Sequence, residues 1–403
     1  KKFLVGNTLG NREPFSLDEN GIPQPLYDVD WQDVSTRNAI SQNHNLSFTG
    51  SDEKSNYGLF LGYNAENGII KESFAKRFVA RAVVDRQMKD WLKVGGSIAY
   101  SRLNQGGADD SDGSYDVIRR FVEFVPFIPF KYDDGVYGTA GHYEGLERQD
   151  NPLAEIYEIT RSSRSNSFSG NTYANFKLMP GLEFTSTLGV NLANNVNPFF
   201  KSSRLVSARN ETNINSSESI FWQWSNRFNY FKQLNADHTI NVLAGVEIQS
   251  YDHLNWTART RDMPDDYYEW NNLGAGATPL APGSSTNEDQ MQSYFGRINY
   301  NLKEKYLVTV TGRFDGSSRF GVINKFAFFP STALAWRISE EAFLRSNEVI
   351  SDLKLRSGYG FTGNSEIGSY RSLANLSTID YVFGGKRVTG AAIGRLANPV
   401  LQW

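Results

Sequence analysis

The sequence contains no cysteine among its 403 residues and carries little net charge. Without cysteine the chain forms no disulfide, holds no metal through thiolates and has no cysteine nucleophile. Its 41 basic and 44 acidic side chains leave a formal net charge of -3, so no strong positive field favours a nucleic-acid partner. These absences exclude disulfide scaffolds and thiol enzymes, and they argue against nucleic-acid binding.

Long hydrophobic runs are absent as well. The densest apolar stretch, residues 121–130, is interrupted by Glu123 and two prolines and is far shorter than the roughly 18 residues of a membrane-spanning helix. The opening KKFLVG has too few apolar residues for a signal peptide and does not begin with methionine. We therefore expect no transmembrane helix, and we expect a mature product, a fragment or part of a longer protein.

Catalytic and metal-binding motifs are scarce. The sequence has four histidines that lie far apart and form no HExxH pair, namely His44, His142, His238 and His253. It contains no nucleophile elbow and no phosphate-binding loop. The acidic stretch at 108–116 only faintly resembles a calcium loop, because Ala108 takes the first ligand position. We predict no enzymatic activity, no cofactor and no metal site, and a solvated loop at 108–116.

Alternation of apolar and polar residues is the dominant pattern. From residue 182 the even positions are mostly apolar, as in Leu182, Phe184 and Leu188, and the intervening residues are mostly polar. A period of two is typical of β-strands, whose side chains point alternately to opposite faces. Similar stretches between residues 42 and 361 predict about twelve strands.

The connections between these strands fall into two length classes. Long ones lie at about 106–160, 196–217 and 253–290, and short ones include 88–91, 179–181 and 303–305. If successive strands are antiparallel, all short turns meet at one end and all long loops at the other, as in outer-membrane barrels. One long link on the short side, 338–351, has Ser339 as a predicted N-cap of a helical turn. A soluble sandwich or propeller remains an alternative on this pattern alone.

The same parity predicts which side chains face lipid. Apolar positions such as Val94, Leu188, Val246 and Val308 should face lipid, whereas charged positions should face the lumen: Lys93, Glu183, Glu247 and Arg313. Trp222 and Trp224 share the apolar parity and suit an interfacial aromatic girdle.

Two long stretches are similar to a known family. The first begins at Met291 and contains DGSSRFG, and the second contains GYGFTGN and ends at Tyr370. DWQD (30–33), NHNLSFTG (43–50) and DWLKVGGSIAYSR (90–102) extend the similarity upstream. The chain resembles the SusC/RagA-like TonB-dependent transporters of Bacteroidetes outer membranes. That resemblance implies an all-β fold, an antiparallel up-and-down transmembrane β-barrel, in a Gram-negative outer membrane.

The resemblance also defines the expected domains. We expect residues 1–41 to be an extracellular segment folded over the barrel mouth, and residues 42–403 to be a partial barrel with roughly half of the 22 strands of a plugged transporter. The family's plug domain and TonB-binding segment have no counterpart in this sequence. Because 394–403 resembles an internal family stretch, the chain should stop in mid-barrel; Trp403 as the closing residue of a complete barrel is the alternative.

Aromatic residues in the predicted loop 253–290 are the candidate contact residues: Trp256, Tyr267, Tyr268 and Trp270. Their rings could stack on a sugar, pack on a partner or pack within the loop. The helix-like stretch 114–127 in the longest loop needs a cover, either neighbouring loops or a docked protein. The resemblance supplies a SusD-like lid lipoprotein as that protein.

The predicted function is TonB-dependent import of a bulky nutrient of the glycan or peptide class. The predicted partners are that SusD-like lipoprotein, the TonB complex and the lipid of the outer membrane. A structural barrel that anchors a surface complex and an open porin are the alternatives. The sequence does not identify the ligand, because related barrels differ mainly in their loops.

Overall fold

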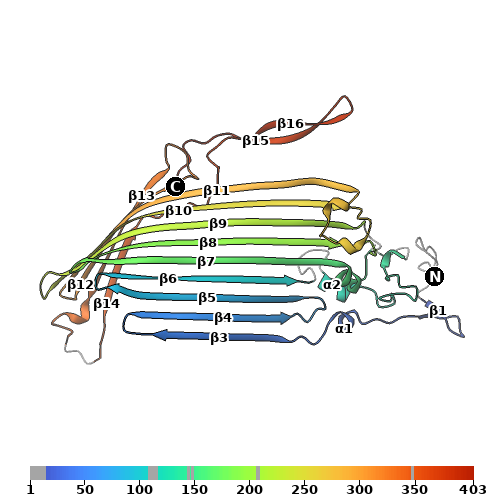
Figure 1. Ribbon diagram of the computed structural model, residues 1–403, viewed down its shortest axis with the longest axis horizontal. Coiled ribbons are helices and arrows are strands. Elements are labelled where there is room, and N and C mark those ends of the chain that lie inside the picture. Colours follow the sequence, from blue (N-terminus) through green and yellow to red (C-terminus); the bar gives the residue numbers. More distant parts are fainter. Residues whose placement is uncertain (1–14, 108–116, 143–145, 147–148, 206–208, 346–348) are drawn as a thin grey trace.

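The structure is a computed structural model, and it describes residues 15–107, 117–142, 146, 149–205, 209–345 and 349–403. One sheet of twelve strands dominates it (Figure 1). Each strand pairs antiparallel with the next along the chain, which confirms the all-β, up-and-down prediction. The strands are β3 (Ser41–Ser51), β4 (Ser55–Asn67), β5 (Phe74–Lys89), β6 (Leu92–Gly106), β7 (Ile159–Met179), β8 (Leu182–Lys201), β9 (Glu211–Gln233), β10 (His238–Arg261), β11 (Thr278–Leu302), β12 (Tyr306–Ser317), β13 (Phe326–Arg337) and β14 (Lys354–Gly360).

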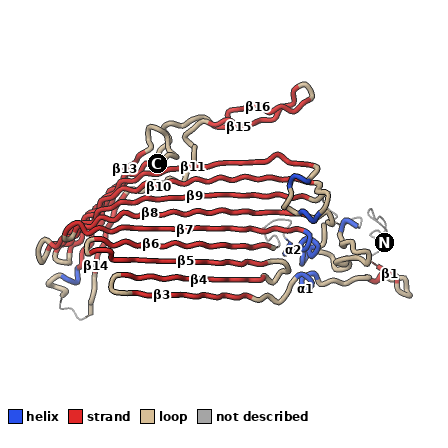
Figure 2. The backbone as a smooth tube through the Cα atoms, viewed as in Figure 1, coloured by secondary structure: helices blue, strands red, loops and turns tan. Residues whose placement is uncertain are grey.

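The two ends of this sheet differ, as the connection lengths predict. Tight turns join the strands at one end, and the helices gather at the other (Figure 2). Gly181, in the turn between β7 and β8, has φ of 82°, and a Cβ there would lie 2.2 Å from the Phe231 carbonyl oxygen. Only glycine fits this turn without strain.

The helical end carries α1 (Trp31–Ser35), α2 (Val117–Glu123) and α3 (Pro152–Glu158), with the 3₁₀ turns η2 (Ala140–His142), η3 (Asp266–Tyr268) and η4 (Leu273–Ala275). A further turn, η5 (Ile338–Glu340), occupies the long link at the opposite end. The predicted helical turn is therefore present, but Ser339 is not its N-cap. It lies inside the turn, and its hydroxyl donates to Asp352 Oδ1 at 3.3 Å.

Two of the predicted loops are much shorter than expected. The strands continue into 196–217 and 253–290, so only 202–210 and 262–277 connect β8 to β9 and β10 to β11. Polar residues there keep the ladder register, as Asn195 opposite Ser217 and Asn255 opposite Ser285 show. The prediction was wrong because backbone pairing continues wherever a neighbouring strand satisfies it, even where apolar alternation fades.

The register separates the sheet into two faces. Residues directly opposite each other on neighbouring strands share a face. Val94 and Val246 therefore lie on the same face, because a row of paired residues joins them across the sheet: Ala174, Ser186 and Asn226. Along this apolar face lie Leu188, Val308, Trp222 and Trp224, as predicted. The opposite, polar face carries Lys93, Glu183, Glu247 and Arg313. The expected division of side chains between two faces is therefore confirmed.

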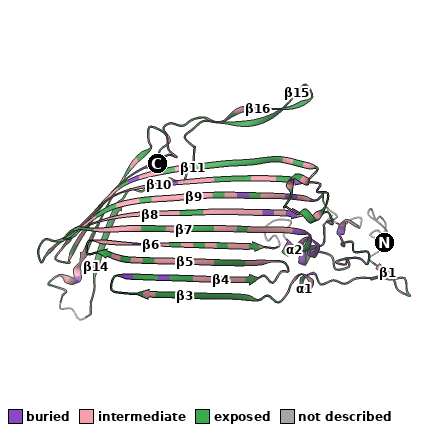
Figure 3. Ribbon diagram, in the orientation of Figure 1, coloured by how far each residue is buried: buried purple, intermediate pink, exposed green. Residues whose placement is uncertain are grey.

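Among the residues that the structure describes, none covers the apolar face. Ile98 is 55% exposed, Val310 is 50% exposed and Phe328 is 60% exposed. Buried side chains instead concentrate at the helical end (Figure 3). Large exposed apolar surface on a regular sheet is what a membrane-facing wall requires.

The buried cluster at the helical end joins segments far apart in sequence. Trp31 of α1 packs edge-on against Phe124 with ring centroids 5.1 Å apart, and its Nε1 donates to the Val125 carbonyl at 3.0 Å. Phe121 of α2 and Ile156 of α3 complete the contact. The buried side of the helix-like stretch is therefore covered by α1 and α3, although Val122 stays 72% exposed.

Two small sheets flank the main one, namely β1 (Phe15–Leu17) with β2 (Pro23–Pro25), and β15 (Asn375–Phe383) with β16 (Lys386–Arg395). Residues 396–403 form no strand, and Trp403 packs on Phe320 with ring centroids 4.6 Å apart. The alternative in which Trp403 closes a barrel strand is thus not what the structure shows. In the described ranges, no helix reaches the length and apolarity needed to span a bilayer.

Candidate functional site

The polar face carries a charge network across β9 to β12. Arg313 Nε lies 2.7 Å from Asp315 Oδ1, and its Nη2 lies 3.7 Å from Glu247 Oε1. Ser293 accepts a hydrogen bond from the same Nη2 at 2.8 Å, and Gln223 donates to Glu247 at 2.6 Å. One guanidinium therefore serves two carboxylates within the wall.

Toward the helical end from this network, the polar face of β7 to β9 is rich in hydroxyls and amides over residues 163–169, 191–197 and 213–219, and charges return only near the strand ends, at Arg161, Lys201 and Glu211. The hydroxyl and amide residues are Ser163, Ser165, Ser167, Ser169, Asn191, Asn195, Asn197, Asn213, Asn215, Ser217 and Ser219. Asn195 donates to Ser217 at 3.3 Å. Such a wall offers hydrogen-bond donors and acceptors to a hydrated interior without selecting for ligand charge.

The aromatic candidates divide into two places. Tyr267 and Tyr268 belong to η3 and contact each other edge-on at 6.1 Å, with 86% and 40% exposure. Trp270 follows in the same loop and is half-buried. Trp256 lies within β10, on the apolar face opposite Ser216 and Ser284, and not in the loop as predicted. Trp256 therefore belongs to a strand, because it pairs with residues of both neighbouring strands, and it is not one of the loop aromatics.

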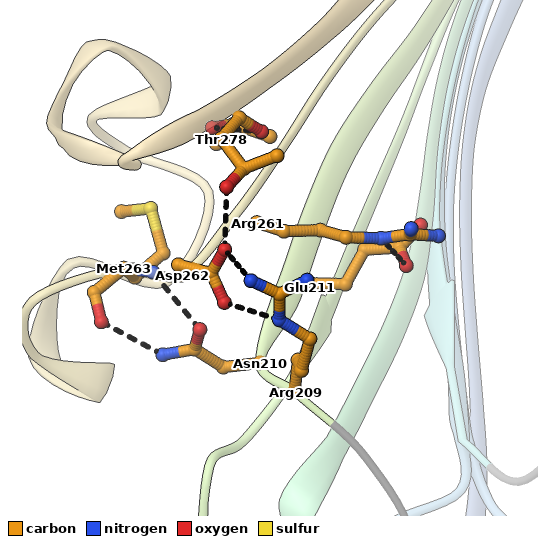
Figure 4. Close-up of polar contacts among 8 residues, drawn as sticks. Arg209, Asn210, Glu211, Arg261, Asp262, Met263 and Thr278 are labelled. Carbon is orange, nitrogen blue, oxygen red and sulfur yellow. Dashed lines mark hydrogen bonds and ion pairs between the residues drawn. The ribbon is translucent and has the colours of Figure 1, made fainter.

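A polar junction holds the loop 262–277 against the β8–β9 connection (Figure 4). Arg209 donates to Asp262 from Nε at 2.8 Å and from Nη2 at 2.6 Å, and the Thr278 hydroxyl donates to the same carboxylate at 2.5 Å. The Thr278 hydroxyl, ahead of Arg209, holds the pKa of the Asp262 carboxyl below its ordinary range. Asp262 has φ of 58°, which turns the chain out of β10.

Asp266 forms the second anchor of this loop. Burial alone would raise the pKa of its carboxyl, but hydrogen bonds from the Ser202 hydroxyl at 2.8 Å and from the Ser203 amide at 3.1 Å outweigh burial and lower it. Asn210 exchanges hydrogen bonds with the Met263 backbone at 2.9 and 3.0 Å. The loop that presents Tyr267 is therefore fixed at its base, while the ring itself reaches solvent.

These anchors have no counterpart among the predicted site residues. Arg209 and Asp262 are 53 positions apart, and no spacing rule links two surface charges over such a distance. The Asp-Met-Pro-Asp-Asp run at 262–266 is the one local signal of a structured turn. The acidic stretch at 108–116, predicted to be a solvated loop, lies outside the described residues.

The DGSSRFG stretch forms a second junction, in the connection between β12 and β13. Arg319 Nη2 lies 3.0 Å from Asp289 Oδ2, and its Nη1 donates to the Ser365 carbonyl at 2.9 Å. Phe320 is 1% exposed. Through Arg319 the DGSSRFG stretch therefore contacts β11 and Ser365, the residue after GYGFTGN, and holds together the chain segments that follow β12 and β14.

Comparisons with known proteins agree with this architecture. Residues 87–403 match the family described as TonB dependent receptor-like, beta-barrel. TonB-dependent receptor P3 of Formosa agariphila is 32% identical over 405 residues, covering 96% of this chain and 39% of that protein. TonB-dependent receptor SusC of Bacteroides thetaiotaomicron is 29% identical over 372 residues, covering 84% of this chain and 35% of that protein.

A solved structure shows the same fold. The structure of the RagAB peptide transporter superposes with a TM-score of 0.81 at 24% identity, covering 94% of this chain and 42% of that chain. The chain therefore spans less than half the length of these relatives.

Proposed function

The chain belongs to the TonB-dependent receptor-like β-barrel family of outer-membrane proteins, and we propose that it forms part of the wall of an importer for a bulky nutrient. The observation that carries this proposal is the two-faced sheet: an exposed apolar face, and an opposite face of paired charges, hydroxyls and amides. An apolar outer face suits lipid, and a polar inner face suits a hydrated passage. We propose no enzymatic role for the chain.

We further propose that the nutrient is a glycan or a peptide and that a SusD-like lipoprotein closes the barrel mouth. The stretch of hydroxyls and amides on the polar face of β7 to β9 supports a large neutral ligand, because hydroxyl and amide groups hydrogen-bond to sugars and to peptide backbones alike. Energy would come from TonB acting on parts of the protein outside this chain. Tyr267, exposed on its anchored loop, would contact the ligand or the lid.

Uptake by whole cells tests the proposal. Cells with the full-length protein are given a mixture of glycans and peptides, plus a small sugar for growth, and depletion of each component is followed by mass spectrometry. We expect at least one large component to be consumed by the wild type only. Deleting the gene or TonB should abolish its consumption, and Tyr267→Ala should slow it while barrel assembly stays unchanged.

The two alternatives give different results in the same experiment. Consumption that persists at full rate without TonB would indicate an open porin. Loss of a surface complex after gene deletion, with every component still consumed, would indicate a structural barrel.

A further inference from the structure

Three cations lie together on the apolar face, where that face ends toward the helical end. Lys76 of β5 is opposite Asn104 of β6, and Asn104 is opposite Arg164 of β7, so the three strands present them in one row. Arg102 lies two residues from Asn104 and therefore shares the face. We call Lys76, Arg102 and Arg164 the basic rim.

The rim borders directly on large apolar side chains. Phe78 is opposite Arg102, and Tyr100 is opposite Phe168 one step closer to the middle of the sheet. Phe78 is 42% exposed, Tyr100 is 37% exposed and Phe168 is 38% exposed. Aromatic rings at this level mark the border between hydrocarbon and headgroups in membrane barrels. The three cations consequently lie at headgroup depth.

No anion of the described residues pairs with the basic rim. All three side chains are exposed, and within the described parts of the chain none of them forms an ion pair. Lys76 Nζ lies 5.6 Å from the centre of the Phe74 ring, and this neutral ring leaves the charge of the ammonium in place. Farther along the same border the charges are acidic, at Glu218, Asp252 and Glu288, so the positive charge is confined to β5 to β7.

We propose that the basic rim binds the phosphate groups of lipids in the outer leaflet of the outer membrane. Long loops face outward in such barrels, which places the rim at that leaflet. Arginine forks bind phosphate oxygens through paired hydrogen bonds, and lysine adds a point charge. The acyl chains of the same lipids would pack on Phe78, Tyr100 and Phe168. This inference concerns the outer surface and is independent of what passes through the lumen.

The full-length protein, purified in detergent, allows a direct test. The probe is bis-phosphorylated lipid A in micelles, and binding is measured by native mass spectrometry across a lipid titration. The variant combines Lys76→Ala, Arg102→Ala and Arg164→Ala. Loss of three phosphate contacts should weaken binding about 100-fold. The matched control is Arg86→Ala, an exposed cation on the same face near the opposite end of β5, which should bind like the wild type.

Two further measurements separate lipid phosphate from other causes. Dephosphorylated lipid A should bind the wild type as weakly as the phosphorylated lipid binds the triple variant, and inorganic phosphate should not compete. A second variant, Arg102→Lys with Arg164→Lys, keeps the positive charge but loses the paired hydrogen bonds of the guanidinium groups, and it should bind the phosphorylated lipid with intermediate affinity. Equal binding by the wild type and the triple variant, equal binding of the dephosphorylated lipid, or competition by inorganic phosphate would each overturn the proposal.

Discussion

Arg319 and Asp289 form an ion pair with Nη2 and Oδ2 3.0 Å apart, and both side chains are mostly shielded from solvent, at 19% and 17% exposure. Arg319 also donates to the Ser365 carbonyl at 2.9 Å. One side chain in the β12–β13 connection thus holds both β11 and the segment after β14. Its contacts give a structural reason for the distinctive DGSSRFG stretch.

Removing this guanidinium should destabilise the part of the sheet formed by β11 to β14. We expect Arg319→Ala to cost about 2 to 3 kcal/mol, because Asp289 would keep its charge without a partner. Unfolding of the purified full-length protein by urea, followed by tryptophan fluorescence, measures the change. Arg319→Lys should recover part of it, and Glu366→Gln should change little, since Glu366 is 85% exposed. Unfolding of Arg319→Ala at the wild-type midpoint would contradict this role.

The two faces of β8 predict opposite responses to an introduced charge. Leu188→Lys places the ammonium on the apolar face and should cost about 2 to 4 kcal/mol near the middle of the membrane. Thr187→Lys places the same charge on the polar face and should assemble like the wild type. The folded fraction in outer membranes, read from heat-dependent mobility on gels, compares the two. Equal assembly of both variants would mean that β8 does not face lipid as described.

The buried cluster at the helical end should depend on Trp31. This side chain is 2% exposed, and Trp31→Ala should cost about 3 to 5 kcal/mol of local stability. Hydrogen exchange should then rise in residues 117–142 and 149–158 and stay unchanged in β8 to β10. Val122→Ala is the control. Because this side chain is 72% exposed, its truncation should change the local stability by less than about 0.5 kcal/mol. Faster exchange throughout the sheet would show that the cluster is not a separate unit.

Glu341 predicts a pH dependence at the opposite end. Hydrogen bonds from Tyr306 at 2.6 Å, from Trp336 at 3.1 Å and from Lys305 at 3.1 Å lower the pKa of its carboxyl from 4.5 to about 2. Because the folded pKa lies below the unfolded one, the stabilisation is complete above pH 4.5 and declines as pH falls toward about 2.

Glu341→Gln should therefore unfold earlier than the wild type at pH 5 to 7, and the difference should narrow between pH 4.5 and 2. Urea unfolding across this pH range measures both midpoints. A constant difference over the whole range would assign the effect to lost hydrogen bonds instead of lost charge.

The sequence by itself determined the strands and their two faces. Alternation places successive side chains on opposite sides whatever the neighbours are, so the opposite faces of Leu188 and Glu183 follow from their positions along the strand. The lengths of the connections likewise determined which end of the sheet carries the long connections. The DGSSRFG and GYGFTGN stretches indicated the family, although not that Arg319 of the first contacts Ser365, the residue after the second.

The tertiary structure decided where the strands end and what holds the loops. Trp256 is part of β10 because β9 and β11 continue to pair with it, and pairing depends on neighbouring strands instead of on local composition. Asp262 meets Arg209 across 53 residues, and Trp31 meets Phe124 across a still longer separation. Such contacts form only when the whole sheet brings distant segments to one end, so no local pattern in the sequence could predict them.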